Sequence, residues 1–384
     1  MSAPKLPRDP GIDLLRGLSI LLVIFNHIGL RIPLKKSAIA AWLPAWAPSA
    51  LNFNGYEAVF VFFVISGFLI AGNVQARWGS LAQVQLRGFY ARRFARIMPC
   101  LVLLVLVLSL LHLLGVEDYL IHRPGQSLPG AVSAAFGLYL NWYEGHTGYL
   151  PGNWDVLWSL SIEEVFYIGF PLVCLFTRRL WVLVPCLIAL AVSLPYSHAL
   201  AAGNDIWQEK AYLPGMAGIA TGVLAALVAA RCPPPRRGFS MALGVAGTVG
   251  LFSVLSMGWI LWSTLADSYV LLLTSSVACL LVSLRWGGWR WSLPGLGWLR
   301  AKGRLSYEIY LTHMFVVYGA VRLYKVWGAD AALGYLWYPP IVLACWLLGW
   351  VVARYLSVPA DRALRRMLLR DAGTEAGTPR TEAV

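Results

Sequence analysis

The stretch IMPCLVLLVLVLSLLHLLG, residues 97–115, decides the fold class of this chain. It is a continuous apolar run, and about 20 such residues cross the hydrocarbon core of a bilayer as a helix. A membrane β-barrel would show short segments of alternating apolar and polar residues instead. The 384 residues are 59% hydrophobic and 13% charged, whereas soluble domains are about 25% charged. The sequence therefore predicts an all-α, polytopic membrane helical bundle.

Similar apolar runs recur along the chain and predict about ten transmembrane helices. They imply a cytoplasmic N-terminal segment of residues 1–11, a membrane-embedded domain of residues 12–357 and a cytoplasmic C-terminal segment of residues 358–384. The last part of that segment, residues 371–384, is small and polar and is expected to be disordered. The expected spans are residues 12–30, 55–72, 97–115, 154–176, 180–196, 212–230, 239–257, 268–285, 304–323 and 338–357.

The net charge of +13 is unequally divided between the two sides of the predicted bundle. With the N-terminus in the cytoplasm, 24 of the 31 Lys and Arg residues fall on the inner side. This asymmetry is the positive-inside pattern of membrane proteins. It explains the basic surplus better than nucleic-acid binding does, so membrane lipids are expected partners and nucleic acid is not. Both termini are expected in the cytoplasm.

The six cysteines carry no recognisable site. None falls in an expected outer loop, and no pair has the C-x-x-C spacing. Neither a disulfide framework nor a thiolate zinc site is predicted, and no metal is expected.

Several segments between the spans are also expected to meet the membrane surface. Two outer loops are long, residues 31–54 and 116–153, and the second contains the apolar stretch 130–142, which is too short to span and is expected to be re-entrant or interfacial. Residues 78–96 are basic and dotted with aromatic side chains, as in an amphipathic helix on the inner leaflet. Residues 285–304 form a second belt of this kind.

Charged side chains inside a membrane span are costly and indicate function by default. Arg16 and His27 are eleven residues apart, so on a helix they share one face, separated by about 16 Å along the axis. Arg16 is expected near the cytoplasmic end. His27 is expected near the outer end, where an imidazole can move a proton near neutral pH. A snorkelling arginine and a histidine bonded to a backbone carbonyl would explain both without function.

A second group of charges opens the span at residues 97–115 with RRFARIMP, residues 92–99. Arg93 and Arg96 are three residues apart, so their guanidinium groups face the same way on a helix. Such groups suit phosphate oxygens. An anchor that touches lipid headgroups is the alternative interpretation.

Two adjacent carboxylates lie inside WSLSIEEVFY, residues 158–167. Neighbouring helix positions point about 100° apart, so Glu163 and Glu164 cannot face one partner. One is expected to meet an arginine or histidine in the bundle, and the other to find a serine or water. Burying two acids gains nothing structurally, and this favours function.

Two further segments carry small or polar groups. FFVISGFLI, residues 62–70, places Ser66 and Gly67 among bulky side chains, where helix packing is the simplest explanation and close approach by a ligand the other. LSYEIYLTH, residues 305–313, sets Tyr310 and His313 one turn apart. A hydrogen-bonded, inert His313 and a working one are equally compatible with this spacing.

Five of the segments quoted in this section, taken in their order along the chain, closely resemble the signatures of the acyltransferase-3 family. The members of this family are ten-helix membrane proteins that O-acylate carbohydrates and other extracytoplasmic acceptors. The resemblance runs from Ile12 to about residue 357 and implies a multi-pass protein of the bacterial inner membrane. Some members add an outer esterase-like domain, and none is expected here. The five segments are IDLLRGLSILLVIFNH (12–27), FFVISGFLI (62–70), RRFARIMP (92–99), WSLSIEEVFY (158–167) and LSYEIYLTH (305–313).

The resemblance also implies roles for individual residues. Arg16 and His27 match the family's Arg-x10-His pair, whose histidine is essential in the active site. Arg93 and Arg96 match its R-x-x-R motif, which is implicated in binding the acyl-CoA donor. The remaining expected site residues are Glu163 and Glu164 for catalysis, and Ser66, Trp158, Ser159, Tyr310 and His313 for substrate.

Together these roles predict one reaction. No permanently bound cofactor is expected; acetyl-CoA or another acyl-CoA is the co-substrate, with its phosphates held by Arg16, Arg93 and Arg96. His27 acts as general base, which contributes typically 10²–10⁴-fold, or as a transient acyl carrier. Glu163 or Glu164 holds its imidazole. The acceptor is a hydroxyl of an extracytoplasmic carbohydrate, free or lipid-linked.

Two other classes of protein remain open from the residues alone. A transporter or flippase of a lipid-linked sugar would explain buried charges without covalent chemistry. A haem or quinone protein would use His27 and His313 as opposed ligands. The acceptor, the acyl group and the oligomeric state are not encoded in any pattern of the sequence.

Overall fold

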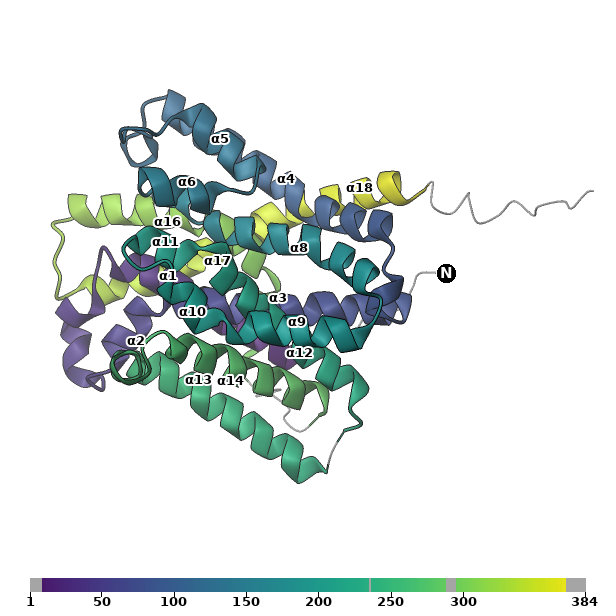
Figure 1. The fold of residues 1–384 in the computed structure, drawn as a ribbon. Helices are drawn as coiled ribbons and strands as arrows, with labels where there is room; N and C mark the ends of the chain where they lie inside the picture. The colour runs from purple at the N-terminus through teal and green to yellow at the C-terminus, as the bar shows by residue number, and fades with distance from the viewer. Residues whose placement is uncertain (1–8, 235, 288–294, 371–384) are drawn as a thin grey trace, which may run out of the picture.

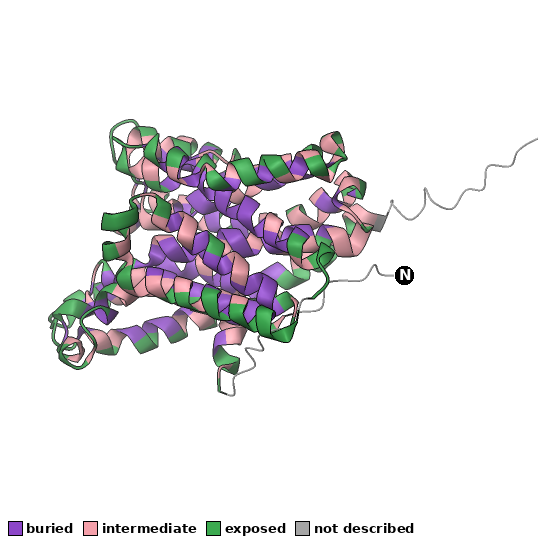
Figure 2. Cartoon of the chain, turned by 60° about the horizontal axis from the view of Figure 1, so that its bottom comes forward, coloured by how far each residue is buried: buried purple, intermediate pink, exposed green. Residues whose placement is uncertain are grey.

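The computed structural model describes residues 9–234, 236–287 and 295–370. Within these residues the chain is a bundle of helices without a strand (Figure 1), which confirms the all-α prediction. Buried residues gather in the interior of the bundle, and exposed residues lie on the outer faces and at the ends of the helices (Figure 2). The tail expected to be disordered, residues 371–384, lies outside the described residues.

The long helices of the bundle are α1 Pro10–Gly29, α3 Gly55–Trp78, α4 Leu86–Leu113, α8 Trp158–Thr177, α12 Tyr212–Arg231, α13 Arg237–Leu265, α14 Ser268–Arg285, α16 Ser306–Val326 and α17 Tyr338–Val352. Shorter helices join them, namely α2 Ala47–Phe53, α5 Leu128–Phe136, α6 Leu140–Thr147, α7 Gly152–Asp155, α9 Leu180–Val192, α10 Leu194–Ala199, α11 Asp205–Lys210, α15 Gly297–Arg304 and α18 Val358–Arg370. Single turns occur at η1 Leu34–Lys36, η2 Ala38–Trp42, η3 Leu81–Gln83, η4 Glu117–Tyr119, η5 Gly334–Trp337 and the π-helical η6 Ala353–Ser357.

Eight helical stretches of the described residues are long and apolar enough to cross a membrane, so the chain is a multi-pass membrane protein. Two of the ten expected spans are built differently. The stretch 180–196 is a 13-residue apolar helix, α9, followed by the short α10. The stretch 304–323 is α16, which has 21 residues but buries polar side chains. Those side chains belong to the site described below.

One of the segments between the spans departs from its sequence-based prediction. No separate surface helix covers residues 78–96, because α4 begins at Leu86 and runs unbroken into the membrane span. The apolar stretch 130–142 is divided between α5 and α6, with Leu138 at φ 60° between them. In the second belt, α15 packs against α1; Trp289 and Trp291 lie outside the described residues.

Helices α3 and α12 approach one another as closely as their backbones allow. A Cβ atom added to Gly67 would lie 1.9 Å from the carbonyl oxygen of Ile219, and one added to Gly222 would lie 1.9 Å from that of Val64. Small residues permit such contact between membrane helices. Packing therefore explains Gly67, whereas its neighbour Ser66 lines a cavity.

Replacing Gly67 with valine should destabilise the protein by about 1–3 kcal/mol or more, because the two backbones must separate. The matched control is Gly169→Val in α8, where a Cβ atom meets nothing within 4 Å. Thermal unfolding of the detergent-solubilised protein, followed by size-exclusion chromatography, compares the two variants. Equal unfolding temperatures for both would contradict the close packing.

Candidate active site

A cavity of about 890 Å³ runs through the bundle. On α3 its lining extends from Val59 near the start of the helix to Arg77 near its end. The helix rises about 27 Å between these residues, compared with about 30 Å for the hydrocarbon core of a bilayer. The cavity thus follows most of the thickness of a membrane. We call the end of the cavity at Arg77 the arginine end, and the opposite end, near Val59, the histidine end.

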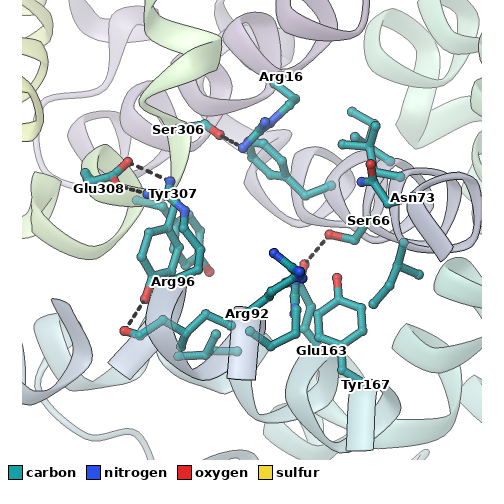
Figure 3. Close-up of a pocket in the computed structure, with 18 of the residues that line it drawn as sticks. Arg16, Ser66, Asn73, Arg92, Arg96, Glu163, Tyr167, Ser306, Tyr307 and Glu308 are labelled. Atoms are coloured by element: carbon teal, nitrogen blue, oxygen red, sulfur yellow. Dashed lines mark hydrogen bonds and ion pairs between the residues drawn. The ribbon is translucent and has the colours of Figure 1, made fainter. Parts of the chain in front are cut away.

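Guanidinium groups dominate the arginine end (Figure 3). Among the described residues, the lining carries two carboxylates, Glu163 and Glu308. Arg16, Arg93 and Arg96 were predicted from their motifs. The lining arginines are Arg16, Arg77, Arg92, Arg93, Arg96, Arg304 and Arg365. Arg92 adjoins the R-x-x-R motif and was visible in the sequence, whereas Arg77 and Arg365 belong to no motif.

Side chains of α16 hold two of the predicted arginines in place. Arg96 donates through both terminal nitrogens to Glu308, at 2.7 and 3.2 Å, and this carboxylate is only 1% exposed. Arg16 donates to the hydroxyl of Ser306 at 2.9 Å. A guanidinium has five N–H donors, so each arginine keeps donors for a ligand. Glu308 belongs to the LSYEIYLTH segment but was not predicted from the sequence as a site residue.

The paired carboxylates of α8 find different partners, as their angular separation predicted. Glu163 accepts a hydrogen bond from Ser66 Oγ at 3.0 Å and lines the cavity. Glu164 pairs with Arg93 at 3.1 Å, and this guanidinium also lies 3.6 Å from the centre of the Tyr167 ring.

The expected contact of Glu163 or Glu164 with His27 is absent from the described part of the chain. Glu163 lies beside Ser66 and near Arg16, and Arg16 is about 16 Å from His27 along α1. The carboxylates therefore belong to the arginine half of the cavity, and the idea that one of them holds the imidazole of His27 is wrong for this structure.

The histidine end is made by α8 and α16. The hydroxyls of Ser159 and Tyr310 lie 2.8 Å apart and both line the cavity. One turn further along α16 is His313, which is completely buried and whose ring centre is 6.0 Å from that of Tyr310. The fourth expected substrate contact of this region, Trp158, does not line the cavity and packs on Phe63 instead.

His27 lies directly against His313, with ring centres 5.0 Å apart. The Nδ1 atom of His313 lies 2.7 Å from the carbonyl oxygen of Tyr310. Because a carbonyl oxygen can only accept, this nitrogen carries a proton, and Nε2 is left as a buried acceptor without a partner among the described residues. Direct ring contact also leaves no space for a haem plane between the two imidazoles.

His27 is half-buried in the last turn of α1 and is not part of the cavity lining. The cavity reaches Tyr310, whose ring centre is 6.0 Å from that of His313, and the His313 ring lies against His27. The carbonyl oxygen of His27 accepts a hydrogen bond from Arg31, which also lies over the ring of Tyr318. His27 is therefore one layer of side chains away from the end of the cavity.

A buried charge cluster near this end of the bundle was missed in the sequence. Lys210 of α11 donates to Glu144 of α6 at 2.9 Å and also pairs with Asp155 of α7. Its ammonium group lies 4.4 Å from the centre of the Tyr149 ring. Lys210 and Glu144 are 3% and 0% exposed. The three charges lie on separate short helices, so no local spacing joins them.

The chain is thus a multi-pass membrane protein with a buried cavity that can hold a ligand. Arginines line one end of this cavity, and two contacting histidines lie close to the other. The chain belongs to the acyltransferase-3 family, because the family model described as an acyltransferase domain matches residues 9–355. This match confirms the resemblance of the five sequence segments.

Curated relatives are similar over part of the chain. The peptidoglycan O-acetyltransferase OatA of Listeria monocytogenes is 29% identical over 214 residues, which cover 54% of this chain and 29% of that protein. The O-acetyltransferase OatA of Staphylococcus aureus (strain NCTC 8325 / PS 47) is 29% identical over 172 residues, 44% of this chain and 25% of the relative. The matched part of this chain thus spans under a third of either relative's length. No solved structure matches the chain.

Proposed function

We propose that this chain is a membrane O-acetyltransferase that moves an acetyl group from acetyl-CoA to a hydroxyl of an extracytoplasmic carbohydrate. The observation that carries the proposal is the long cavity, which has arginine side chains at one end and a pair of imidazoles close to the other. Family membership supports acyl transfer, and the names of the relatives support an acetyl group and a glycan acceptor.

The arginine end suits the nucleotide part of the donor. Guanidinium groups bind phosphate oxygens well, and Arg16, Arg93 and Arg96 already have fixed positions because Ser306, Glu164 and Glu308 hold them. The pantetheine arm follows α3 towards Tyr310. Since the basic surplus indicates a cytoplasmic arginine end, the donor enters from the cytoplasm, and we place the protein in the bacterial inner membrane.

At the histidine end, His27 is the base. It takes the proton of the acceptor hydroxyl as this oxygen attacks the thioester carbonyl, and it returns the proton to the sulfur when the C–S bond breaks, so that free CoA thiol leaves. A change of rotamer at Tyr310 opens the cavity towards His27, while His313 stays beside it. The hydroxyls of Ser159 and Tyr310 stabilise the oxyanion.

His313 takes over the positioning role expected for a glutamate. Its unpartnered Nε2 is an acceptor beside the His27 ring. When it accepts an N–H from His27, the other nitrogen of His27 is left free to remove a proton. Transient acetylation of His27, followed by transfer to the acceptor, uses the same geometry.

Release of CoA thiol separates this proposal from a flippase of lipid-linked sugars. The purified chain, given acetyl-CoA and a digest of cell-wall glycan, is expected to produce free thiol and acetylated glycan in equal amounts. The thiol is measured with a chromogenic disulfide, and the glycan by mass spectrometry. Movement of glycan across a vesicle membrane without thiol release would contradict the transferase and favour the flippase.

A further inference from the structure

Three arginines that the reaction does not use gather at the arginine end of the cavity. Arg77 lies in the last turn of α3, Arg92 in the first turns of α4, and Arg365 in the middle of α18. All three line the cavity, and their positive charges are close enough to repel one another. Helix α18 packs along α4, which brings Arg365 to this position. We call these residues the outer arginine cluster.

The outer arginine cluster is not neutralised as the deeper arginines are. Arg365 donates to Asp361 on its own helix at 2.7 Å. Within the described residues, Arg77 and Arg92 form no ion pair, and Nε of Arg92 is buried without a hydrogen-bond partner. Three guanidinium groups therefore face one carboxylate, which leaves an excess of two positive charges. Keeping like charges together is unfavourable unless an anion binds among them.

We propose that the outer arginine cluster binds a phosphomonoester dianion. A monoester carries about −1.5 to −2 charges at pH 7, which matches the excess charge of the cluster. On the proposed function, on which this step rests, the group is the 3′-phosphate on the ribose of the acyl-CoA donor. That phosphate lies at the nucleotide end of the donor, far from the thioester.

The position of the cluster along the cavity agrees with this assignment. Arg77 lies eleven residues beyond Ser66 on α3, a rise of about 16 Å towards the arginine end. Ser66 donates a hydrogen bond to Glu163, and the next residue, Glu164, pairs with Arg93. These deeper groups therefore lie beside Ser66 on α3. Arg92 adjoins Arg93 on α4, but its charge is felt by Arg77 and Arg365 and not by Glu164, which pairs with Arg93. The deeper arginines are thus left for the pyrophosphate, and the outer arginine cluster gives a separate contact that recognises CoA by its third phosphate.

Binding of CoA and of 3′-dephospho-CoA to the full chain in phosphatidylcholine nanodiscs tests the inference without an acceptor. Charged hydrogen bonds contribute about 1.5–3 kcal/mol, so loss of the 3′-phosphate should weaken binding about 10- to 100-fold. The double variant Arg77→Gln/Arg365→Gln should bind CoA as weakly as the wild type binds 3′-dephospho-CoA. Its affinity for 3′-dephospho-CoA should be unchanged.

The matched control is Arg362→Gln/Arg366→Gln, which removes two charges from the exposed face of α18 and should discriminate as the wild type does. Equal binding of both nucleotides by the wild type would overturn the inference and leave the proposed function standing. Binding of neither nucleotide would contradict the donor itself. In a third arm, phosphatidic acid is added to the nanodiscs; discrimination should survive, and its loss would assign the cluster to a lipid phosphate.

Discussion

Replacing His27 with alanine is expected to lower acetyl transfer by about 10²–10⁴-fold, the usual contribution of a general base. An alcohol is a weak nucleophile at neutral pH, and the neighbouring His313 is completely buried, whereas His27 is half-buried. An acceptor hydroxyl therefore reaches His313 less readily than His27. Affinity for acetyl-CoA should change little, because the arginine end lies about 16 Å away along α1.

The measurement is acetylation of cell-wall glycan by membranes that contain equal amounts of folded protein, together with the affinity of each variant for acetyl-CoA. The matched control is His122→Ala, since His122 is an exposed histidine whose ring lies beside the carbonyl of Leu120. This variant should retain wild-type transfer. Wild-type rates in the His27 variant would show that the proton is removed elsewhere.

Replacing Lys210 with methionine is expected to destabilise the protein by about 3–5 kcal/mol, because it leaves Glu144 buried without its ammonium partner. Both side chains are almost completely buried, so solvent screening does not weaken the effect. The exposed Lys325 provides the matched control. Its replacement by methionine should change the free energy of unfolding by no more than about 0.5 kcal/mol.

The loss in the Lys210 variant should depend on pH. Burial, reinforced by Asp155, raises the pKa of Glu144 above its ordinary value, and Lys210 opposes this shift. Without Lys210 the folded state binds a proton more tightly than the unfolded state, so stability falls as pH rises. Thermal unfolding at pH 5 and pH 8 should show the larger loss at pH 8. A loss of the same size at both pH values would contradict an unpaired buried carboxylate.

Local spacing predicted the arginine end of the site well. Arg93 and Arg96 lie one turn apart and face the same cavity. Glu163 and Glu164 point about 100° apart on their helix and have separate partners. Arg16 also lines this cavity, as its position at the entry of the first span indicated. These residues were predictable because helix geometry alone relates them.

Contacts between distant helices could not be predicted in the same way. His27 and His313 are at opposite ends of the sequence, and nothing in either segment indicates that their rings touch. The Lys210 cluster joins three short helices, whereas Glu144 and Lys210 were expected in two separate outer loops and Asp155 at the start of a span. Arg365 reaches the cavity because α18 continues from α17 through η6 and packs along α4, and its basic face is equally typical of a helix on a lipid surface.

Inverted inner-membrane vesicles test the central claim most directly, since they present the cytoplasmic side of the membrane outwards and enclose the extracytoplasmic glycan. Radiolabelled acetyl-CoA, which does not cross the membrane, is supplied outside the vesicles. The account predicts that label becomes covalently attached to the enclosed glycan with wild-type protein and not with the His27→Ala variant. Equal labelling by both proteins, or label confined to material on the outer face, would contradict transfer through the cavity to His27.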